Sequence, residues 1–295
     1  MNFLCAADTL GNCLDTAFKG LDLAVFSLFG NMQCDLLTAL AHVFSALASP
    51  FFMIMIGVIG LALVFFKRSR RMGLAVIFAL LASLLLVNII IKPMVLRIRP
   101  YNTLQDIASY FGWYQNAGML AESDYSFPSG HTASAVSMAV VLCIGHIKAG
   151  KRKIAWVFAL EALLVAASRI YLMIHYPTDV FAGIICGIIA GFLAYGIMLL
   201  VMKLTENTAW SRLDWAVKFP YLKGIKAAVS IAFVVALSFV ISFSIIYNDA
   251  HNDVLRCAYD DEYSCMNKAQ TGSKYPAIDG EYYCKIHYKE INSED

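Results

Sequence analysis

The stretch from Tyr125 to Ser134, "YSFPSGHTAS", places polar and conformationally special residues between two long apolar runs. A chain that enters a helix through Pro-Ser-Gly exposes free backbone N–H groups in the first helical turn, and Gly130 lets an anion approach them closely. His131, at the start of that helix, can give a proton to a leaving oxygen beside the anion. Taken alone, the stretch is also compatible with a simple turn followed by an interfacial histidine.

A second polar segment, "SRIYLMIHYPTD" from Ser168 to Asp179, separates two further apolar runs. Pro177 suits the first turn of a helix, and Asp179 falls in the same turn, where the helix dipole keeps a carboxylate ionised. An ionised Asp179 close to His175 can fix the tautomer of the imidazole and raise its basicity, as a nucleophile or base requires. Alone, this pair is more typical of a hydrogen-bonded interfacial histidine.

The third segment is "KPMVLRIRP", from Lys92 to Pro100. On a helical course Lys92 and Arg99 share one face, because they are seven residues apart, and Pro100 ends the segment. Together with Arg169 they supply three cations, which suit an anion with several oxygens, since arginine can bind phosphate bidentately and lysine acts as a point charge. Arg97 lies off that face, and we interpret it as a membrane anchor. Lys92 alone could also be an anchor.

Six apolar runs frame these segments. Of 295 residues, 60% are hydrophobic and 15% are charged, which is the composition of an integral membrane protein. A hydrocarbon core of about 30 Å needs roughly 20 helical residues, and six buried helices of a soluble protein would not be so poor in charge. The runs lie at 45–66, 72–92, 132–147, 154–172, 178–202 and 227–247, the third being shorter than the others. We predict an all-α polytopic membrane helical bundle with about six transmembrane helices.

The chain divides into three predicted parts. Residues 1–44 form an N-terminal segment, in which 21–44 mix apolar with polar residues and favour an amphipathic helix in the interface, with a seventh span as the alternative. Residues 45–247 form the membrane domain, with its polar motifs between 92 and 179. Residues 248–295 form a polar C-terminal tail.

Charge bias predicts the orientation. Basic residues cluster at Lys67–Arg71, at 146–153 and at 203–226, three loops that alternate correctly and should face the cytoplasm. Residues 101–127 contain no Lys or Arg, and the tail from Asp249 onward has ten acidic residues against five basic ones. The polar motifs and the tail should therefore face outward, from what we expect to be a bacterial plasma membrane.

The eight cysteines fall into two groups. Cys143 and Cys186 lie in predicted spans and are expected to be packing residues. The other six fall outside the spans, at Cys5, Cys13, Cys34, Cys257, Cys265 and Cys284. In an oxidising compartment they permit disulfides, and we predict at least one in the C-terminal tail, with a pairing that the spacing does not give. No cysteine pair with zinc-ligand spacing has a partner pair, so we expect no metal site.

Lys-x6-Arg-Pro, then Pro-Ser-Gly-His, then Ser-Arg-x5-His-x3-Asp, in this order, resembles the type 2 phosphatidic acid phosphatase superfamily. That superfamily includes bacterial lipid pyrophosphatases, glucose-6-phosphatase and vanadium haloperoxidases. All three motifs match without a departure, and "HYPTDVFAG" at 175–183 is similar to the bacterial membrane branch. The resemblance covers 45–202 and leaves out the loop 101–127 and the tail.

The resemblance implies a role for each motif residue. His175 would attack phosphorus and become a phosphohistidine, Asp179 would orient it, and His131 would protonate the leaving group. The implied phosphate-binding residues are Lys92, Arg99, Ser129, Gly130 and Arg169. Family members work without a metal, and we expect no cofactor here, since the carboxylates at 106, 122 and 124 look scattered along one loop.

The resulting hypothesis is a membrane phosphatase for lipid phosphates or pyrophosphates, with undecaprenyl pyrophosphate as the favoured substrate. The alternatives are a phosphatidic acid or phosphatidylglycerol phosphate phosphatase, a lipid phosphotransferase with the same residues, and a non-enzymatic lipid-phosphate binder or transporter. Loss of either histidine would favour the binder, and both are present. The expected partners are the lipid substrate and the membrane, and we expect no nucleic acid.

Overall fold

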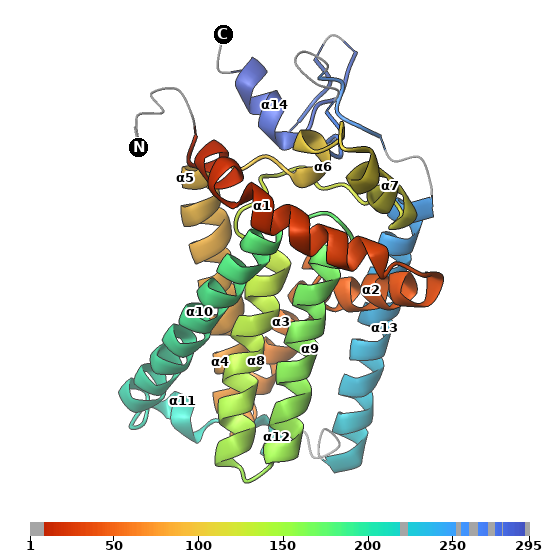
Figure 1. Ribbon diagram of the computed structural model, residues 1–295. Helices are drawn as coiled ribbons and strands as arrows, with labels where there is room; N and C mark the ends of the chain where they lie inside the picture. Colours follow the sequence, from red (N-terminus) through yellow and green to blue (C-terminus); the bar gives the residue numbers. More distant parts are fainter. Residues whose placement is uncertain are drawn as a thin grey trace.

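The computed structural model describes residues 9–218, 224–251, 255–259, 265–270, 275–278 and 280–292. Within these ranges every regular element is a helix, and the tail contributes only isolated β-bridges (Figure 1). The predicted all-α class is confirmed. Cys5 lies outside the described residues.

The long apolar helices form the membrane bundle. Five of the described helical segments are long and apolar enough to span a bilayer, and a sixth span would need the bent N-terminal pair. Large apolar side chains on their outer faces are exposed, for example Trp156, Phe192 and Ile54, as expected for contact with lipid. The bundle helices are α3 (Pro50–Val64), α4 (Arg70–Leu84) with its continuation η1 (Leu85–Ile91), α8 (Gly130–Lys148), α9 (Arg152–Tyr171), α10 (Pro177–Leu204) and α13 (Gly224–His251).

Five of the six predicted spans are recovered with shifted boundaries, and the predicted span 45–66 is not recovered as a full-length span. The predicted span 45–66 was too long, because Ser49 caps a new helix whose first residue is Pro50. The resulting α3 has 15 residues and is about 22 Å long, short for a full crossing. The predicted span 72–92 instead belongs to a longer apolar segment, Arg70–Thr103.

Residues 21–44 are not one helix. Helices α1 (Leu10–Asn31) and α2 (Asp35–Leu47) meet at a bend of 120°. In Figure 1, α1 runs across one end of the bundle instead of along it. A Cβ at Gly11 would lie 2.5 Å from the Cα of Arg97, so α1 docks closely against the segment after α4. The interfacial location of this part stays a prediction, but its helix begins at Leu10 and not near residue 21.

Helices α8 and α10 approach each other closely through a stripe of small residues. A Cβ at Gly183 would lie 2.8 Å from the carbonyl oxygen of Ser129, and a Cβ at Gly187 would lie 2.7 Å from that of Ala133. Gly191, one turn further, is equally close to α8. Glycines at this spacing let two backbones pack without intervening side chains. The N-termini of α8 and α10 are thereby held side by side.

Short helices and the tail cover the bundle end at which α8 and α10 begin. They are α5 (Lys92–Val95), α6 (Pro100–Thr103), α7 (Ala108–Asn116) and α14 (Lys285–Ile291), and Figure 1 shows them together at the top. Beneath them lies an aromatic core that includes Phe26, Tyr110 and Tyr176. The tail docks on this end, because Asn267 Oδ1 accepts hydrogen bonds from Tyr101 Oη at 3.0 Å and from Asn102 Nδ2 at 3.2 Å.

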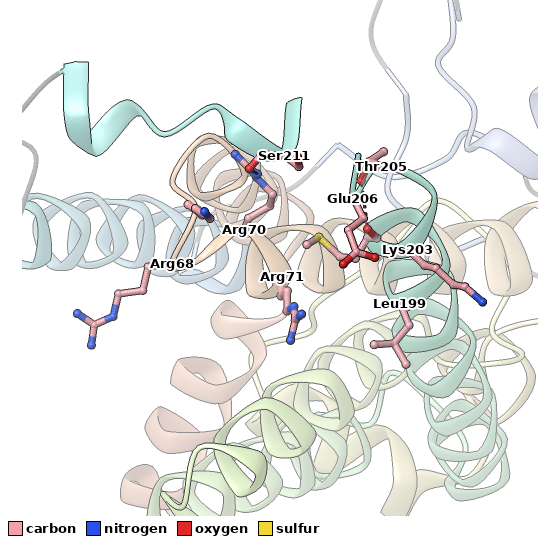
Figure 2. A pocket seen from close by; sticks show the side chains of 10 residues that line it. Arg68, Arg70, Arg71, Leu199, Lys203, Thr205, Glu206 and Ser211 are labelled. Carbon is pink, nitrogen blue, oxygen red and sulfur yellow. Dashed lines mark hydrogen bonds between the residues drawn. The ribbon is translucent and has the colours of Figure 1, made fainter. Parts of the chain in front are cut away.

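The opposite end is basic. Helices α11 (Ala209–Arg212) and α12 (Trp215–Lys218) lie there, beside a cavity of about 720 Å³ lined by Arg68, Arg71 and Lys203 among others (Figure 2). Arg70 is buried and donates to the Val64 carbonyl at 2.8 Å, so it joins α4 to α3. The cationic loops used for the orientation prediction therefore do gather at one end of the bundle.

Candidate active site

Lys92 and Arg99 lie together at the end of the apolar segment, but not by the predicted route. Helix α5 ends at Val95, and Leu96 has φ = 55°, which turns the chain out of the helix. The expectation of one helical face is therefore wrong. Both cations instead form ion pairs with Asp124. Lys92 Nζ lies 2.5 Å from its Oδ2, and Arg99 Nη2 lies 2.6 Å from its Oδ1. Both side chains are buried.

His175 is fully buried in the short connection between α9 and α10. Its Nδ1 lies 3.6 Å from Asp179 Oδ2 and 3.4 Å from Ser126 Oγ, and Ser126 also donates to Asp179. Asp179 is the third residue of α10 and accepts from the Tyr176 backbone N–H at 3.0 Å. The other ring nitrogen, Nε2, lies 3.1 Å from Arg99 Nη1. The imidazole thus has its Nδ1 beside a carboxylate and its Nε2 among the cations.

Arg97 is not a membrane anchor. It is fully buried, and its guanidinium contacts Asp179 Oδ1 at 2.6 Å, Asp22 Oδ2 at 2.8 Å and Asp15 Oδ1 at 2.8 Å. It also stacks over the ring of Tyr176 at 3.6 Å. The earlier interpretation failed because α1, which supplies two of these carboxylates, is far from residue 97 in the sequence. Arg97 joins α1 to the N-terminus of α10.

Two carboxylates of the loop between α7 and α8 occupy the cationic site. Glu122 contacts Arg99 Nη2 at 2.5 Å and also accepts from Arg169 Nη2. Asp124 pairs with Lys92 and Arg99 as described above. The sequence analysis treated these residues as scattered along the loop, but only Asp106 stays apart and exposed. All three predicted cations are therefore paired with carboxylates.

Arg169 and His131 complete the cluster around Glu122. Arg169 is buried in the last turn of α9, where Nη1 donates to Ser45 Oγ at 2.6 Å and Nε has no hydrogen-bond partner among the described residues. His131 Nδ1 lies 3.9 Å from Glu122 Oε1. A buried guanidinium donor without a partner is costly, so the Nε of Arg169 favours an acceptor such as an oxyanion.

Ser129 and Gly130 form the start of α8, as predicted. Ser129 is the N-cap, and its hydroxyl accepts from the Thr132 backbone N–H at 3.4 Å and from the Thr132 hydroxyl at 3.0 Å. Its own backbone N–H donates to the carbonyl of Asp179 at 3.0 Å. This bond connects the first turn of α8 to the first turn of α10.

The surrounding charges set the protonation states. Burial lowers the pKa of His175 well below its usual range, and Arg99 and Arg169 lower it further. Burial raises the pKa of Glu122, but Arg99 and Arg169 outweigh it and hold that pKa well below the usual range. Lys92 and Arg99 likewise lower the pKa of Asp124 against the effect of burial. His175 is therefore neutral at physiological pH, and both loop carboxylates are ionised.

An apolar groove of about 620 Å³ ends at this cluster. Side chains of α3 and α4, such as Met53, Leu61 and Leu80, line most of it. Its polar end is formed by Asn88, Lys92, Glu122, Asp124, Gly130, His131 and Ser134. The groove has the size and the mostly apolar lining of a ligand site, with a few polar groups at one end.

Sequence reasoning found the cations and both histidines but missed the residues that hold them. Ser126 lies inside the quoted "YSFPSGHTAS" stretch, five residues before His131, and was not predicted to be a site residue. Asp22, which also holds Arg97, belongs to the stretch 21–44 that was predicted to be an interfacial helix. No local pattern predicts its contact with Arg97.

Comparison with known proteins gives the same family as the motifs. The family model for the PAP2 superfamily matches residues 72–203, which include every predicted site residue. The chain is 31% identical over 138 residues to an undecaprenyl-diphosphatase of Sulfolobus acidocaldarius, covering 45% of this chain and 58% of that one. It is 27% identical over 191 residues to phosphatidylglycerophosphatase B of Bacillus subtilis, covering 63% and 85%.

Further comparisons agree. A lipid A 4'-phosphatase of Porphyromonas gingivalis is 31% identical over 139 residues, covering 46% of this chain and 56% of that one. The chain thus spans less than two thirds of that relative and of the archaeal one. The crystal structure of a transmembrane PAP2 type phosphatidylglycerolphosphate phosphatase from Bacillus subtilis has the same fold, with a TM-score of 0.53 at 24% identity, covering 65% of this chain and 92% of that one. The motifs and the family match over residues 72–203 therefore agree that this part of the chain is similar to the PAP2 superfamily, and the fold is consistent with it.

Proposed function

We propose that this protein is a membrane phosphatase that hydrolyses lipid phosphates or pyrophosphates through a phosphohistidine. The observation that carries the proposal is the apolar groove that ends at Lys92, His131 and the cations around Glu122. A lipid can lie with its chain along α3 and α4 while its phosphate reaches that polar end. A soluble sugar phosphate gains nothing from such a groove.

The geometry suits a two-step displacement. Nε2 of neutral His175 attacks phosphorus, since Nδ1 faces Asp179 and Ser126. The bond from phosphorus to the leaving oxygen breaks, and His131 gives that oxygen its proton. Water then attacks the phosphohistidine, His131 takes a proton from the water, and the P–N bond breaks to release phosphate. Lys92, Arg99 and Arg169 stabilise the charge on the phosphoryl oxygens, which is the main requirement of phosphoryl transfer.

Undecaprenyl pyrophosphate is the substrate that we favour, followed by phosphatidylglycerol phosphate and phosphatidic acid. Three cations suit the higher charge of a pyrophosphate. The names of two relatives, an undecaprenyl-diphosphatase and a phosphatidylglycerophosphatase, support the same two lipid classes. For binding, the loop carboxylates of Glu122 and Asp124 must leave the cations to the substrate.

The test of substrate class is phosphate release in detergent micelles without Mg²⁺. We expect undecaprenyl pyrophosphate to be hydrolysed fastest, then the phospholipid monophosphates, with glucose 6-phosphate much slower at equal concentration. Glucose 6-phosphate turnover equal to that of the lipids would contradict the lipid proposal. Phosphatidic acid faster than the pyrophosphate would keep the enzyme class and reject only the favoured substrate.

A substitution in the groove tests whether the groove binds the acyl or prenyl chain of the lipid. Gly57 lines the groove, and a Cβ there would meet only Leu80 Cδ1, at 3.5 Å. Gly57→Leu should displace about two methylenes of a bound chain, which at about 0.8 kcal/mol each lowers kcat/KM for lipids roughly tenfold. Vanadate inhibition of the residual activity should be unchanged. The matched control is Gly196→Leu on α10, where a Cβ meets open space.

Thiol labelling tests the outward orientation of the site. Arg68, which lines the basic cavity with Ser211 of α11, and Gln115, in α7, are both exposed, and Figure 1 shows α11 and α7 at opposite ends of the bundle. In a background with Cys5, Cys13 and Cys34 replaced by serine, we expect a cysteine at 115 to react with an impermeant reagent in intact cells, and a cysteine at 68 to react only after permeabilisation. The reverse pattern would put the site in the cytoplasm and exclude exported lipid carriers as substrates.

A further inference from the structure

Three cysteines and one histidine of the C-terminal tail converge on one point. They are Cys257, Cys265, Cys284 and His287. One ligand atom from each lies within 4.8 Å of all the others, and all four residues are buried. The cysteines are free thiols in this structure, so the predicted disulfide is not formed in it.

The distances fit one tetrahedral metal ion. His287 Nδ1 lies 3.3 Å from Cys257 Sγ and 3.6 Å from Cys284 Sγ. Tetrahedral zinc with Zn–S near 2.3 Å and Zn–N near 2.0 Å separates its ligand atoms by roughly 3.5 to 3.8 Å. A disulfide would instead bring two sulfurs to about 2.0 Å and leave the third cysteine and the histidine without a role.

The surroundings suit thiolates. The backbone N–H of Cys284 donates to Cys257 Sγ at 3.1 Å, and Asn267 Nδ2 donates to Cys284 Sγ at 3.5 Å. Tyr259 stacks on the His287 ring with centroids 3.8 Å apart, which fixes its orientation. Hydrogen bonds to the sulfurs and a fixed imidazole are the second-shell features of metal sites.

The tail also needs such a centre in order to fold. Its described part contains no regular strand and one short helix, and its apolar cluster consists of the three cysteines with Ile286 and a few partly buried tyrosines. A segment this small rarely has a sufficient core without disulfides or a metal. We propose that Cys257, Cys265, Cys284 and His287 bind one structural Zn²⁺ ion.

The proposed site would fasten the tail to the loop between α7 and α8 that carries Glu122. The Cys257 backbone N–H donates to the carbonyl of Asn267 at 2.9 Å, and the next residue, Lys268, donates its N–H to the carbonyl of Glu122 at 3.2 Å. Asn267 also accepts from Tyr101 and Asn102, close to Arg99. Zinc binding would therefore hold in place the segment that positions Glu122.

The sequence analysis expected no metal because it considered cysteine pairs alone. The close pair here is Cys-x2-His, Cys284 with His287, and the other two ligands are 8 residues apart in the sequence. The inference rests on this geometry and does not depend on the phosphatase activity.

The test is the metal content of the full chain, purified in mild detergent under reducing, anaerobic and chelator-free conditions. We expect one zinc per chain by mass spectrometry. After exchange with Co²⁺, thiolate-to-cobalt charge-transfer and tetrahedral d–d absorption bands should appear. Cys284→Ser and His287→Ala should each lower zinc from about one to near zero equivalents, because ligand loss removes most of the binding free energy. Cys34→Ser, at an exposed cysteine outside the cluster, should keep its zinc.

Three outcomes would overturn the proposal. The first is wild-type protein that contains no zinc and gives no thiolate–cobalt bands after metal addition. The second is metal that remains bound in both ligand variants, and the third is peptide mapping that finds a disulfide among the three cysteines in protein from the native membrane. The wild-type measurements decide the question even if the variants do not fold.

Discussion

His175→Ala should abolish both turnover and the trapped phosphoenzyme. The reason is that Nε2 of His175 faces Arg99 at 3.1 Å and is the imidazole nitrogen directed away from Asp179. The measurement is phosphoenzyme formation with a labelled lipid phosphate after a quench in alkali, in which the P–N bond of a phosphohistidine survives. His146→Ala, a histidine near the cytoplasmic end of α8 by our orientation, is the matched control and should retain full activity.

His131→Ala should behave differently. If His131 is the general acid, its loss slows turnover by roughly 10²–10⁴-fold but leaves some phosphoenzyme.

The low pKa of His175 keeps the ring neutral at acidic pH, so phosphoenzyme formation should not fall as the pH passes downward through 6.5. A phosphoenzyme in His175→Ala, or an acidic limb near pH 6.5 caused by His175, would contradict the assignment.

Arg97→Met should lower both stability and activity, although Arg97 need not touch substrate. The substitution leaves the buried carboxylates of Asp22 and Asp179 without their cation, which typically costs about 3–5 kcal/mol. It also removes the contact of Arg97 with Asp179 Oδ1, so Asp179, held then by Ser126 and the Tyr176 backbone, orients His175 less firmly. The measurements are thermal unfolding in detergent and the rate of phosphate release.

Two further variants separate these effects. Arg68→Met, at an exposed arginine on the opposite end, should change neither quantity. Asp22→Asn added to Arg97→Met should restore part of the stability, because one unpaired charge is gone, but not the rate. Recovery of the rate in that double variant would show that Arg97 acts only through the stability of α1.

The sequence predicts the fold where long apolar runs are bounded by prolines, helix-capping residues or basic loops. Helices α8, α9 and α10 begin and end within two residues of the predicted spans, because Ser129, Pro177 and the basic loops mark their ends. The start of α3 was predicted wrongly. Hydropathy treats 45–66 as one apolar run, but the Ser49 cap and Pro50 begin a new helix within it.

The site was predictable where residues of one motif act together, and unpredictable where distant segments meet. Asp179 beside His175 follows from helix geometry within one turn. Arg97 contacts α1, and Glu122 contacts Arg99 and Arg169. These residues are far apart in the sequence, and the local sequence pattern does not predict which distant segments meet. The same holds for the tail cysteines, which needed a histidine to become recognisable as a ligand set.

The carboxylates of Glu122 and Asp124 neutralise the three cations of the site, which are Lys92, Arg99 and Arg169. Three buried cations without anions would repel one another and destabilise the folded protein, and the loop removes that repulsion between turnovers. The same carboxylates compete with any phosphate for the cations, including the inorganic phosphate left after hydrolysis. Under the proposed function, the loop would lower the affinity for substrate and product alike, and we expect inhibition by inorganic phosphate to be weak for that reason.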